Sequence, residues 1–580
     1  MKSALKAAMF FTLVGAGNLA VTQSLPTFTH VVLIVQENRT PDNLFGVATT
    51  SEASLLPSLG AGVDLARASQ YYAGDTSAIE WCLGACFDPG HGPTSWHQQW
   101  NGSEPTYNSH LNPGGATSCV NKTKGTATKC NGQPVCVYPD TCTYQVPQFP
   151  QDTYVSAAYD MVNGQPALLP YFDIAHKYGF ANYFYQTNEG PSQPAHDFLF
   201  GGTSAPAGSS GDPFGQYLTY FGAGNSTPQT PTGCTSSASM LLINPSAQFG
   251  PTLTTTCFEH RTLTDLLDNA NPQLTWRYYA RKLDDIWTAP NGIGHICLLQ
   301  NGACAGFGNN VVKDLQGGGQ SHSQILMDIN SCALTSVSWV IPNGGWSDHP
   351  ALSGNESSTA GEGGPNWVAN IINAVGGKDA TGKILNNCGY WSNTVVFVVW
   401  DDWGGFFDHA PLENALYEVN WPNCTLPWGC GYTYGFRVPF LVVSAYTPDG
   451  YVSGECGIQG YPPCPNKGNP SLGQYYQHDF GSILAFIENT FTLGIGCINN
   501  GNNPNCKNGG RGTYPFADYY APELVQSGYT AVPLADFFGL PTAKGFEPII
   551  TTKSTFTTNY FLNYTGPWTD PDSDATDPQN

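Results

Sequence analysis

Four short runs of uninterrupted apolar residues, rich in β-branched side chains, constrain the fold of this chain more than any other feature. They read HVVLIVQ (His30–Gln36), VSWVI (Val337–Ile341), VVFVVW (Val395–Trp400) and VPFLVVSA (Val438–Ala445). A strand with one face in water alternates apolar and polar residues, whereas a strand buried on both faces of a parallel sheet does not. The runs therefore predict strands at the centre of a largely parallel sheet.

Segments with helical spacing of apolar residues lie between and after these runs. They are Pro170–Tyr178, Leu263–Asn269, Trp367–Val375 and Ser482–Thr492. Strands that alternate with helices indicate an α/β fold, here a three-layer sandwich around the sheet. Because the sequence has no internal repeat, heptad pattern or long linker, we expect one domain over residues 25–565.

Charged residues are scarce and mostly acidic. Only 11% of the 580 residues are charged, against a usual value of about 25%, and 21 Lys+Arg face 43 Asp+Glu for a net charge of −22. This balance excludes the usual kind of nucleic-acid binder, which needs a clustered positive surface. It also gives no electrostatic attraction to anionic membranes, and it is compatible with an acidic working environment.

Three segments, at about 50–148, 203–257 and 295–320, are rich in Gly, Ser, Thr, Pro and Cys and show weak periodicity. We expect them to be long, Cys-rich loop insertions over the sheet, serving as functional covers or as disulfide-held surface. The tail at 566–580 is acidic, contains proline and has no apolar face to pack, so we expect it to be disordered.

Residues 1–24 resemble a secretory signal peptide. Lys2 and Lys6 precede an apolar run from Ala7 to about Val14, and small residues follow near Ala20. An N-terminal anchor helix is the alternative, but the run is shorter than the roughly 20 residues that a bilayer span needs, and no later stretch is long enough. We expect a secreted protein, extracellular or periplasmic.

The cysteines agree with export. All 18 lie after residue 24 and none forms the CxxC pair of a structural zinc site, so disulfides are expected. The pairing does not follow from sequence, but local clusters suggest short loops joined by near neighbours: Cys82/Cys86, Cys119/Cys130/Cys136/Cys142, Cys424/Cys430, Cys456/Cys464 and Cys497/Cys506.

Polar and acidic residues follow three of the apolar runs directly. The sequences are Glu37-Asn38-Arg39-Thr40, then Pro342-Asn343 leading to Asp348-His349, then Asp401-Asp402 leading to Asp408-His409. Ligands of open α/β sheets bind beyond the carboxyl ends of the strands, where these groups would meet. Carboxylate and amide oxygens suit Mg²⁺, Ca²⁺ or Mn²⁺, and imidazole adds Zn²⁺ or Fe.

Each acidic strand end also has a purely structural interpretation, as a helix cap or a hydrogen-bonded surface pair. Three such ends in a chain with so few charges favour a divalent metal site.

Several longer blocks resemble, in the same order, the bacterial phosphoesterase family. They are HVVLIVQENRTPDNLFG, GPSQPAHDFLFGG, VVFVVWDDWGGFFDHAP, GFRVPFLVVSAYTPDGYVS and HDFGSILAFIENTF. That family contains non-specific phospholipases C and secreted acid phosphatases, and its fold is similar to that of the alkaline-phosphatase superfamily. The resemblance covers about residues 28–545.

The resemblance implies roles for particular residues. Glu37, Asn38, Asp401 and Asp402 would bind the metal, and Ser192 in the Gly-Pro-Ser turn would be the nucleophile. A hydroxyl is a weak nucleophile at its own pKa, and a coordinated divalent cation would favour the alkoxide. The alternative for Ser192 is that it simply begins a helix.

Family members also carry histidines that bind phosphate or protonate the leaving group. His349 and His409 match these best, and His91 is a weaker candidate. His97, His196, His295 and His478 receive no role from the resemblance.

The chain departs from the family pattern at two places. The family usually has Asp-Glu where this chain has Asp401-Asp402, and the shorter acid changes the reach of the second ligand. Many members continue Pro-Asn-Arg or Pro-Asn-His after the nucleophile turn, where this chain has Pro194-Ala195-His196. The missing Asn would alter contacts to phosphate or substrate.

We therefore expect a secreted, metal-dependent phosphoric ester hydrolase with a covalent phosphoserine intermediate. The substrate is a phosphate ester, and phospholipid diesters compete with monoesters. Aromatic residues at Trp346, Trp403, Phe406 and Phe407 would either contact an acyl chain or pack the core. Another class is a secreted binding or cell-surface protein on a hydrolase-like scaffold. A sulfatase or phosphomutase relative is disfavoured because there is no Cys-x-Pro-x-Arg run.

Overall fold

The structure is a computed structural model of the chain. The residues that it describes are 26–46, 55–65, 91, 165–188, 190, 192–202, 204, 232–237, 257–259, 262–314, 323–349, 363–406, 408, 434–454, 478–493, 534–552 and 556–564, with short paired strands between them. The expected signal peptide at 1–24 and the acidic tail at 566–580 lie outside these residues.

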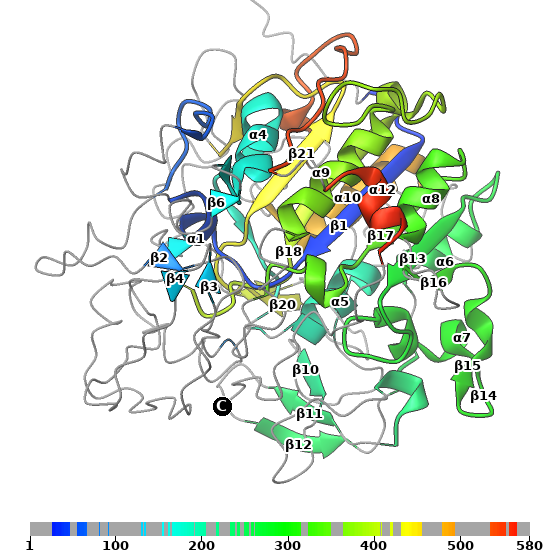
Figure 1. Ribbon diagram of the computed structural model, residues 1–580. Coiled ribbons are helices and arrows are strands. Elements are labelled where there is room, and N and C mark those ends of the chain that lie inside the picture. Colours follow the sequence, from blue (N-terminus) through cyan, green and yellow to red (C-terminus); the bar gives the residue numbers. More distant parts are fainter. Residues whose placement is uncertain are drawn as a thin grey trace, which may run out of the picture.

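An eight-stranded mixed sheet forms the centre of the molecule (Figure 1). Its strands, in spatial order, are β16 (Val311–Lys313), β13 (Trp276–Ala280), β17 (Val337–Val340), β1 (His30–Gln36), β18 (Thr394–Trp400), β21 (Phe440–Ser444), β8 (Gly179–Ala181) and β22 (Tyr451–Ser453). All neighbours pair in parallel except at β21, which is antiparallel to both β18 and β8.

The four apolar runs form the four central strands, as predicted. Every residue of β17, β18 and β21 is buried, and in β1 only His30 is partly exposed. The direction of β21 differs from the parallel arrangement expected for its run. A strand buried on both faces has the same continuous apolar sequence in either direction, so composition does not reveal orientation.

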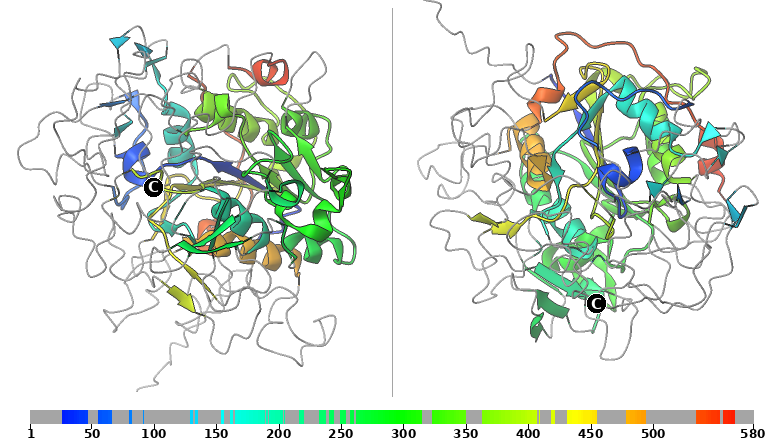
Figure 2. Two further views of the ribbon diagram at one scale, coloured as in Figure 1. Left: turned by 90° about the horizontal axis from the view of Figure 1, so that it is seen from below. Right: turned by 90° about the vertical axis from the view of Figure 1, so that its left-hand side faces the viewer.

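Helices cover both faces of the sheet and make the predicted three layers (Figure 2). One face carries α4 (Leu169–Lys177), α9 (Gly363–Val375), α8 (Gln324–Asn330) and α12 (Thr558–Leu562). The other carries α5 (Ser192–Gly201) and α10 (Phe480–Phe491), and α6 (Leu263–Asp268) packs against α5. The four predicted helices correspond to α4, α6, α9 and α10.

Local sequence explains the ends of these helices. The carboxylate of Asp479 caps α10 by accepting a hydrogen bond from the amide of Ser482 at 2.9 Å. Helix α9 starts at Gly363, four residues before the predicted start. A Cβ at Gly363 would lie 2.2 Å from the carbonyl oxygen of Gly345, so this close approach needs glycine.

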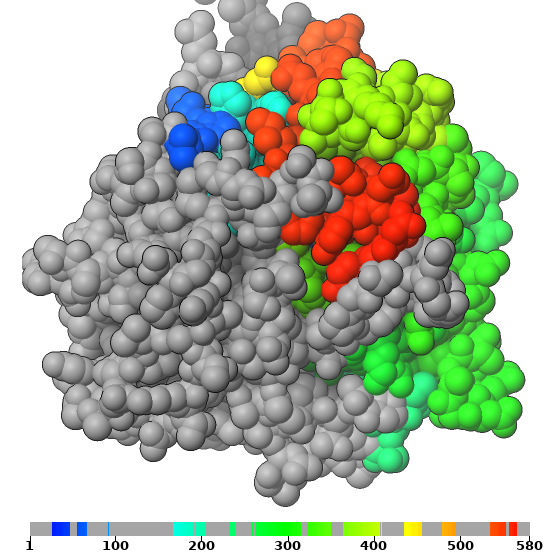
Figure 3. All heavy atoms as spheres, viewed as in Figure 1, coloured from blue at the N-terminus to red at the C-terminus, as the bar shows by residue number. Residues whose placement is uncertain are grey.

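Helix α9 is buried along its whole length although it carries three asparagines. The amide of Asn366 donates to Thr552 Oγ1 at 2.8 Å, and that of Asn373 donates to the carbonyl oxygen of Ile549 at 2.9 Å. The C-terminal segment that accepts these bonds, with α12, lies on the outside of this layer (Figure 3). This segment therefore satisfies, through a side chain and its backbone, polar groups that would otherwise be buried without partners.

The expected insertions contain regular structure. The 203–257 segment holds a three-stranded antiparallel sheet of β10 (Gln216–Thr219), β11 (Met240–Ile243) and β12 (Phe249–Leu253). The 295–320 segment holds the β14 (Leu299–Gln300) and β15 (Ala303–Cys304) hairpin, and then contributes β16 to the edge of the main sheet. Three residues of an edge strand are too few to show a period, which is why composition suggested only a loop.

Short elements complete the described structure. They are α1 (Pro41–Phe45), β2 (Glu80–Trp81), β3 (Lys129–Cys130), β4 (Gln133–Pro134), β5 (Tyr154–Val155), β6 (Met161–Val162), β7 (Gln165–Pro166), β9 (Phe184–Tyr185), α7 (Gly294–Cys297), β19 (Glu418–Asn420), β20 (Gly431–Thr433) and β23 (His478–Asp479).

Disulfides join Cys234 to Cys257, Cys297 to Cys304, and Cys332 to Cys388. The first two link near neighbours. The third spans 56 residues and joins the segment after α8 to the segment before β18. Of the cysteines in the clusters named from sequence, Cys130 lies in the short strand β3, and the others lie outside the residues described. Within the described part of the chain, no helix has the length and apolar character needed to cross a bilayer.

Truncation of the central strand should destabilise the protein. Ile34 in β1 is fully buried, so Ile34→Ala removes apolar contacts and leaves a cavity in the core. The substitution should lower the unfolding free energy by about 2–5 kcal/mol. Ile384→Ala is the matched control, because that side chain is 63% exposed and its loss should change stability by less than about 0.5 kcal/mol. Urea denaturation followed by fluorescence measures both, and equal effects would contradict the assigned core.

Candidate active site

The parallel pairing of β1 and β18 continues past the ends of both strands. The amide of Asp401 donates to the carbonyl oxygen of Gln36 at 2.9 Å, and the amide of Arg39 donates to that of Asp402 at 3.0 Å. The backbone therefore holds Glu37-Asn38 beside Asp401-Asp402, as expected for strands whose carboxyl ends meet at one edge.

The turn at Asn38 has an unusual backbone. Asn38 is left-handed, with φ of 54°, a conformation that asparagine tolerates better than most residues. Gly404 packs against it, and a Cβ there would lie 2.6 Å from the carbonyl oxygen of Asn38. The amide of Gly404 also donates to Asp402 Oδ1 at 2.6 Å, so the glycine allows the two acidic strand ends to approach.

Ser192 begins helix α5 and points at the same place. Its Oγ lies 3.3 Å from Glu37 Oε2, 3.4 Å from Asp402 Oδ2 and 3.5 Å from Asn38 Oδ1. Gly190, two residues before, has φ of 78°, and a Cβ there would lie 2.1 Å from the carbonyl oxygen of His91. Gly190 therefore packs directly against the backbone of His91.

The oxygens in this centre face one another, which fits a cation between them. One end of the Asn38 amide lies 3.2 Å from Asp401 Oδ1 and from Asp402 Oδ1, and the other lies 2.7 Å from His349 Nε2 and 3.3 Å from His91 Nε2. With a cation present, the amide oxygen faces the carboxylates and the NH₂ donates to the imidazoles. Oxygens of Glu37, Asn38, Ser192, Asp401 and Asp402 could then serve as hard ligands of the kind that Mg²⁺, Ca²⁺ or Mn²⁺ prefers.

Two of the three predicted histidines lie at the Asn38 amide. The rings of His91 and His349 are 5.8 Å apart and nearly perpendicular, and both side chains are buried. Arg39 holds the His349 loop, because its Nε and Nη2 donate to the carbonyl oxygen of Asp348 at 2.9 and 2.6 Å. The third, His409, lies outside the described residues.

A second buried arginine fixes the segment that leads to position 409. Arg437 Nη2 lies 2.7 Å from Asp408 Oδ1 and 3.5 Å from Asp42 Oδ1, with all three side chains at or near complete burial. Asp42 belongs to α1, which follows the Glu37-Asn38 turn. Arg437 therefore connects the segment after β1, which carries Asp42, to the segment after β18, which carries Asp408. The burial of these charges is tolerated because they are paired.

Two further groups contact Glu37 and were not identified from sequence. Trp287 Nε1 donates to Glu37 Oε2 at 3.2 Å, and His196 Nε2 lies 3.2 Å from Glu37 Oε1 and 3.6 Å from Asp401 Oδ2. The Glu37, His196 and Asp401 ligand atoms lie close enough together to hold a metal ion themselves. His196 falls one helical turn after Ser192, and that i, i+4 spacing was the available signal.

Burial and mutual charge shape the titration of these groups. Burial and the charge of Asp401 raise the pKa of Glu37. For Asp401, burial is outweighed by the hydrogen bond and charge of His196, and its pKa is lowered. Burial alone would lower the pKa of His196, but its bonds to Asp401 and Glu37 raise it to about 10. A bound cation would oppose both the protonation of Glu37 and the charge on His196.

The aromatic residues near the strand ends pack the interior. Trp346, Trp403 and Phe406 are all buried, and the guanidinium of Arg39 lies 4.5 Å from the Phe406 ring centre. Of the two interpretations given above, the structure supports packing for these three residues. Phe407 lies outside the described residues.

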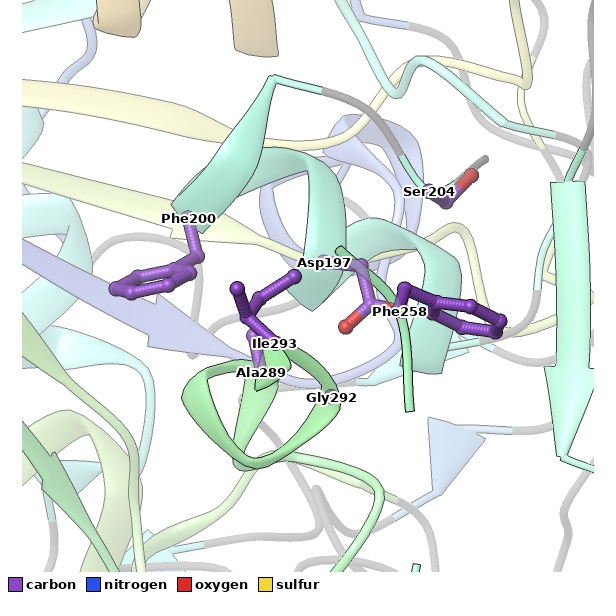
Figure 4. Close-up of a pocket in the computed structure, with 7 residues that line it drawn as sticks. All are labelled: Asp197, Phe200, Ser204, Phe258, Ala289, Gly292 and Ile293. Atoms are coloured by element: carbon purple, nitrogen blue, oxygen red, sulfur yellow. The ribbon is translucent and has the colours of Figure 1, made fainter. Parts of the chain in front are cut away.

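A small pocket lies beside α5 and is lined by Asp197, the residue that follows His196 (Figure 4). The side chain of Asp197 points into it beside Phe258 and Ile293, and Phe200, Ser204, Ala289 and Gly292 complete the lining. Its apolar surroundings raise the pKa of Asp197 to about 8, although the charge of His196 opposes this. None of the acidic strand-end residues lines this pocket, so it is distinct from the acidic centre.

The fold and the site together define an α/β sandwich protein with a buried carboxylate centre at the carboxyl edge of its sheet. The chain belongs to the Phosphoesterase family, whose model matches residues 28–494. This confirms the family resemblance seen in the sequence over most of its expected range.

Named relatives share shorter stretches. Phospholipase C A of Mycobacterium tuberculosis is 34% identical over 130 residues, which are 21% of this chain and 22% of that protein. Non-hemolytic phospholipase C of Pseudomonas aeruginosa is 27% identical over 199 residues, 31% of this chain and 26% of that protein. The chain thus spans about a quarter of the length of these relatives.

Among solved structures, Ps i-CgsB in complex with k-i-k-neocarrahexaose aligns with 60% of this chain and 69% of its own. The TM-score is 0.24 and the identity 10%.

Removal of the Asp197 charge should stabilise the protein in a pH-dependent way. The folded-state pKa of about 8 exceeds the unfolded value near 3.8, so from about pH 4 to 8 the carboxyl ionises in the unfolded chain but stays protonated in the fold. The free energy of unfolding therefore falls as pH rises through this range. We expect Asp197→Asn to raise the thermal midpoint at pH 7.5 and to change it little at pH 4.

Asp379→Asn is the control for this experiment. The Asp379 carboxylate sits in an exposed turn and accepts hydrogen bonds from the amides of Thr381 and Lys383, so its replacement should give no gain at pH 7.5. An unchanged midpoint for Asp197→Asn at both pH values would contradict the assigned environment of Asp197.

Proposed function

We propose that this chain is a metal-dependent phosphoric ester hydrolase of the phospholipase C type, with Ser192 as nucleophile. One observation carries the proposal: side-chain oxygens of Glu37, Asn38 and Asp402 lie within 3.5 Å of the Ser192 hydroxyl, and Asp401 Oδ1 lies 3.2 Å from the Asn38 amide. Membership of the Phosphoesterase family and relatives named as phospholipases C support the reaction class.

The bound cation supplies charge neutralisation at the phosphoryl oxygens and favours the serine alkoxide. Glu37, Asn38, Asp401 and Asp402 are the protein ligands that we assign, with Ser192 completing the set. Their buried position, away from bulk water, strengthens every electrostatic interaction in the centre.

In the first step, Ser192 Oγ forms a bond to phosphorus while the bond from phosphorus to the leaving alcohol oxygen breaks. The hydroxyl proton passes to a carboxylate at 3.3–3.4 Å, from Glu37 or Asp402. The position of Ser192 at the start of a ten-residue helix places the positive end of the helix dipole at the phosphoryl group.

His349 and His91 are positioned on the other side of Asn38 to protonate the leaving oxygen and to bind phosphate oxygens. In the second step, water attacks the phosphoserine, the serine–phosphorus bond breaks and Ser192 regains its proton. His409 remains a candidate, from the family resemblance, for phosphate binding or for protonation of the leaving group.

A non-catalytic binding or cell-surface protein on this scaffold is the competing class. Decay of an active site leaves gaps in its ligand set, whereas here every predicted ligand is present and buried, and three of the four face the nucleophile. Secretion is part of the proposal, and the three disulfides agree with it.

Ser192→Ala should abolish turnover without unfolding the protein. Loss of the nucleophile removes the covalent route, so we expect kcat to fall by about 10³-fold or more, with an unchanged thermal midpoint. Ser204→Ala is the matched control, since Ser204 is buried near the end of α5 but lines only the Asp197 pocket. Retention of most activity by Ser192→Ala would overturn the assignment.

The substrate class and metal dependence are tested together. Hydrolysis of p-nitrophenyl phosphate and p-nitrophenyl phosphorylcholine should be compared from about pH 3 to 8, with and without chelator. We expect chelator to suppress turnover and the diester to be preferred. Preference for the monoester would indicate an acid phosphatase, and silence on both by the metal-loaded protein would favour the binding-protein class.

A further inference from the structure

His196 is the group that faces the outer oxygens of two metal-binding carboxylates. It is completely buried, and its Nε2 lies 3.2 Å from Glu37 Oε1 and 3.6 Å from Asp401 Oδ2. It stands four residues after Ser192 on helix α5, so both side chains project from the same side of one rigid element.

The two carboxylates use their other oxygens elsewhere. Glu37 Oε2 faces Ser192 Oγ and accepts from Trp287 Nε1, and Asp401 Oδ1 accepts from the backbone amides of Asn38 and Asp402. Asp401 Oδ2 has no hydrogen bond within the described residues apart from the approach of His196. His196 is therefore the described group that holds the outer oxygen of each carboxylate.

His196 could act on these carboxylates either as a metal ligand or as a hydrogen-bond donor. A ligating Nε2 must be deprotonated, which places the proton on Nδ1, and ligating histidines normally donate that second N–H to an acceptor. Here Nδ1 is buried and no described residue accepts from it. Burying an unpaired donor costs about 1–3 kcal/mol, whereas an Nε2–H directed at Glu37 is satisfied.

We infer that His196 is a positioning residue that donates its Nε2–H to Glu37 and Asp401, and so keeps Glu37 Oε2 directed at Ser192 and Asp401 Oδ1 beside the Asn38 amide. The role deepens the proposed function and depends on it. Because His196 and Ser192 share α5, a shift of this helix would move the nucleophile and the carboxylate orientation together.

Two amide substitutions separate this role from ligation and from simple packing. The side-chain nitrogen of Gln reaches about as far as His Nε2 and can donate to Glu37, whereas that of Asn reaches only as far as Nδ1. We expect His196→Asn to weaken Mn²⁺ binding to the chelator-stripped enzyme by about 10–100-fold and His196→Gln to restore it to within about threefold.

Isothermal titration with Mn²⁺ gives the Kd, and thermal melting of the cation-free variants checks folding. His295→Asn is the control, because His295 also lies between two carboxylates, Glu259 and Asp265, but is partly exposed and outside the acidic centre. It should leave the Mn²⁺ affinity unchanged.

Equal loss of Mn²⁺ binding in both His196 variants would show ligation and overturn the inference, and unchanged binding in both would overturn it as well. If His196→Asn does not fold, His196→Gln decides alone: a tenfold loss contradicts the role. If the wild-type protein binds no Mn²⁺ or Ca²⁺, the proposed metal site fails too, an outcome distinct from a failure confined to His196.

Discussion

The parallel pairing of β1 with β18 is the constraint on which the rest of the structure depends. Seven residue pairs lie in register, from His30 opposite Thr394 to Gln36 opposite Trp400. The next residues are the acidic ones, so the register alone sets Glu37 and Asn38 against the Asp-Asp pair. Because side chains alternate along a strand, a slip of one residue would turn these groups to opposite faces.

Burying the carboxylates of the acidic centre costs free energy, and the surrounding residues offset this cost. Carboxylates removed from water are tolerated when they are hydrogen-bonded or paired with positive charge. Backbone amides, the Trp287 indole and His196 supply the hydrogen bonds, and two buried arginines, Arg39 and Arg437, hold the loops behind the centre. The remaining oxygens face one another around Ser192, where a divalent cation would provide the missing positive charge.

Much of the fold could be predicted because burial on both faces leaves a strong trace in sequence. The four central strands and four of the helices follow from apolar runs and helical spacing. Elements with weak traces were missed: β13 is interrupted by Arg277, and β16 has only three residues. The start of α9 was missed because its Gly-Gly-Pro opening lacks helical periodicity, and the need for glycine there comes from the close approach of Gly363 to Gly345.

The acidic strand ends by themselves indicated a metal site at one edge of the sheet, and the family pattern implied Ser192 and the histidines. The sequence by itself determined which polar side chains follow the end of each buried strand, because they are the next residues in the chain. Tertiary structure alone decided the direction of β21, the approach of His91 to the Gly-Pro-Ser turn, and the contact of His196 and Trp287 with Glu37. The His196 and Trp287 contacts join residues 159 and 250 positions apart, and no local periodicity records a contact made through the packing of separate elements.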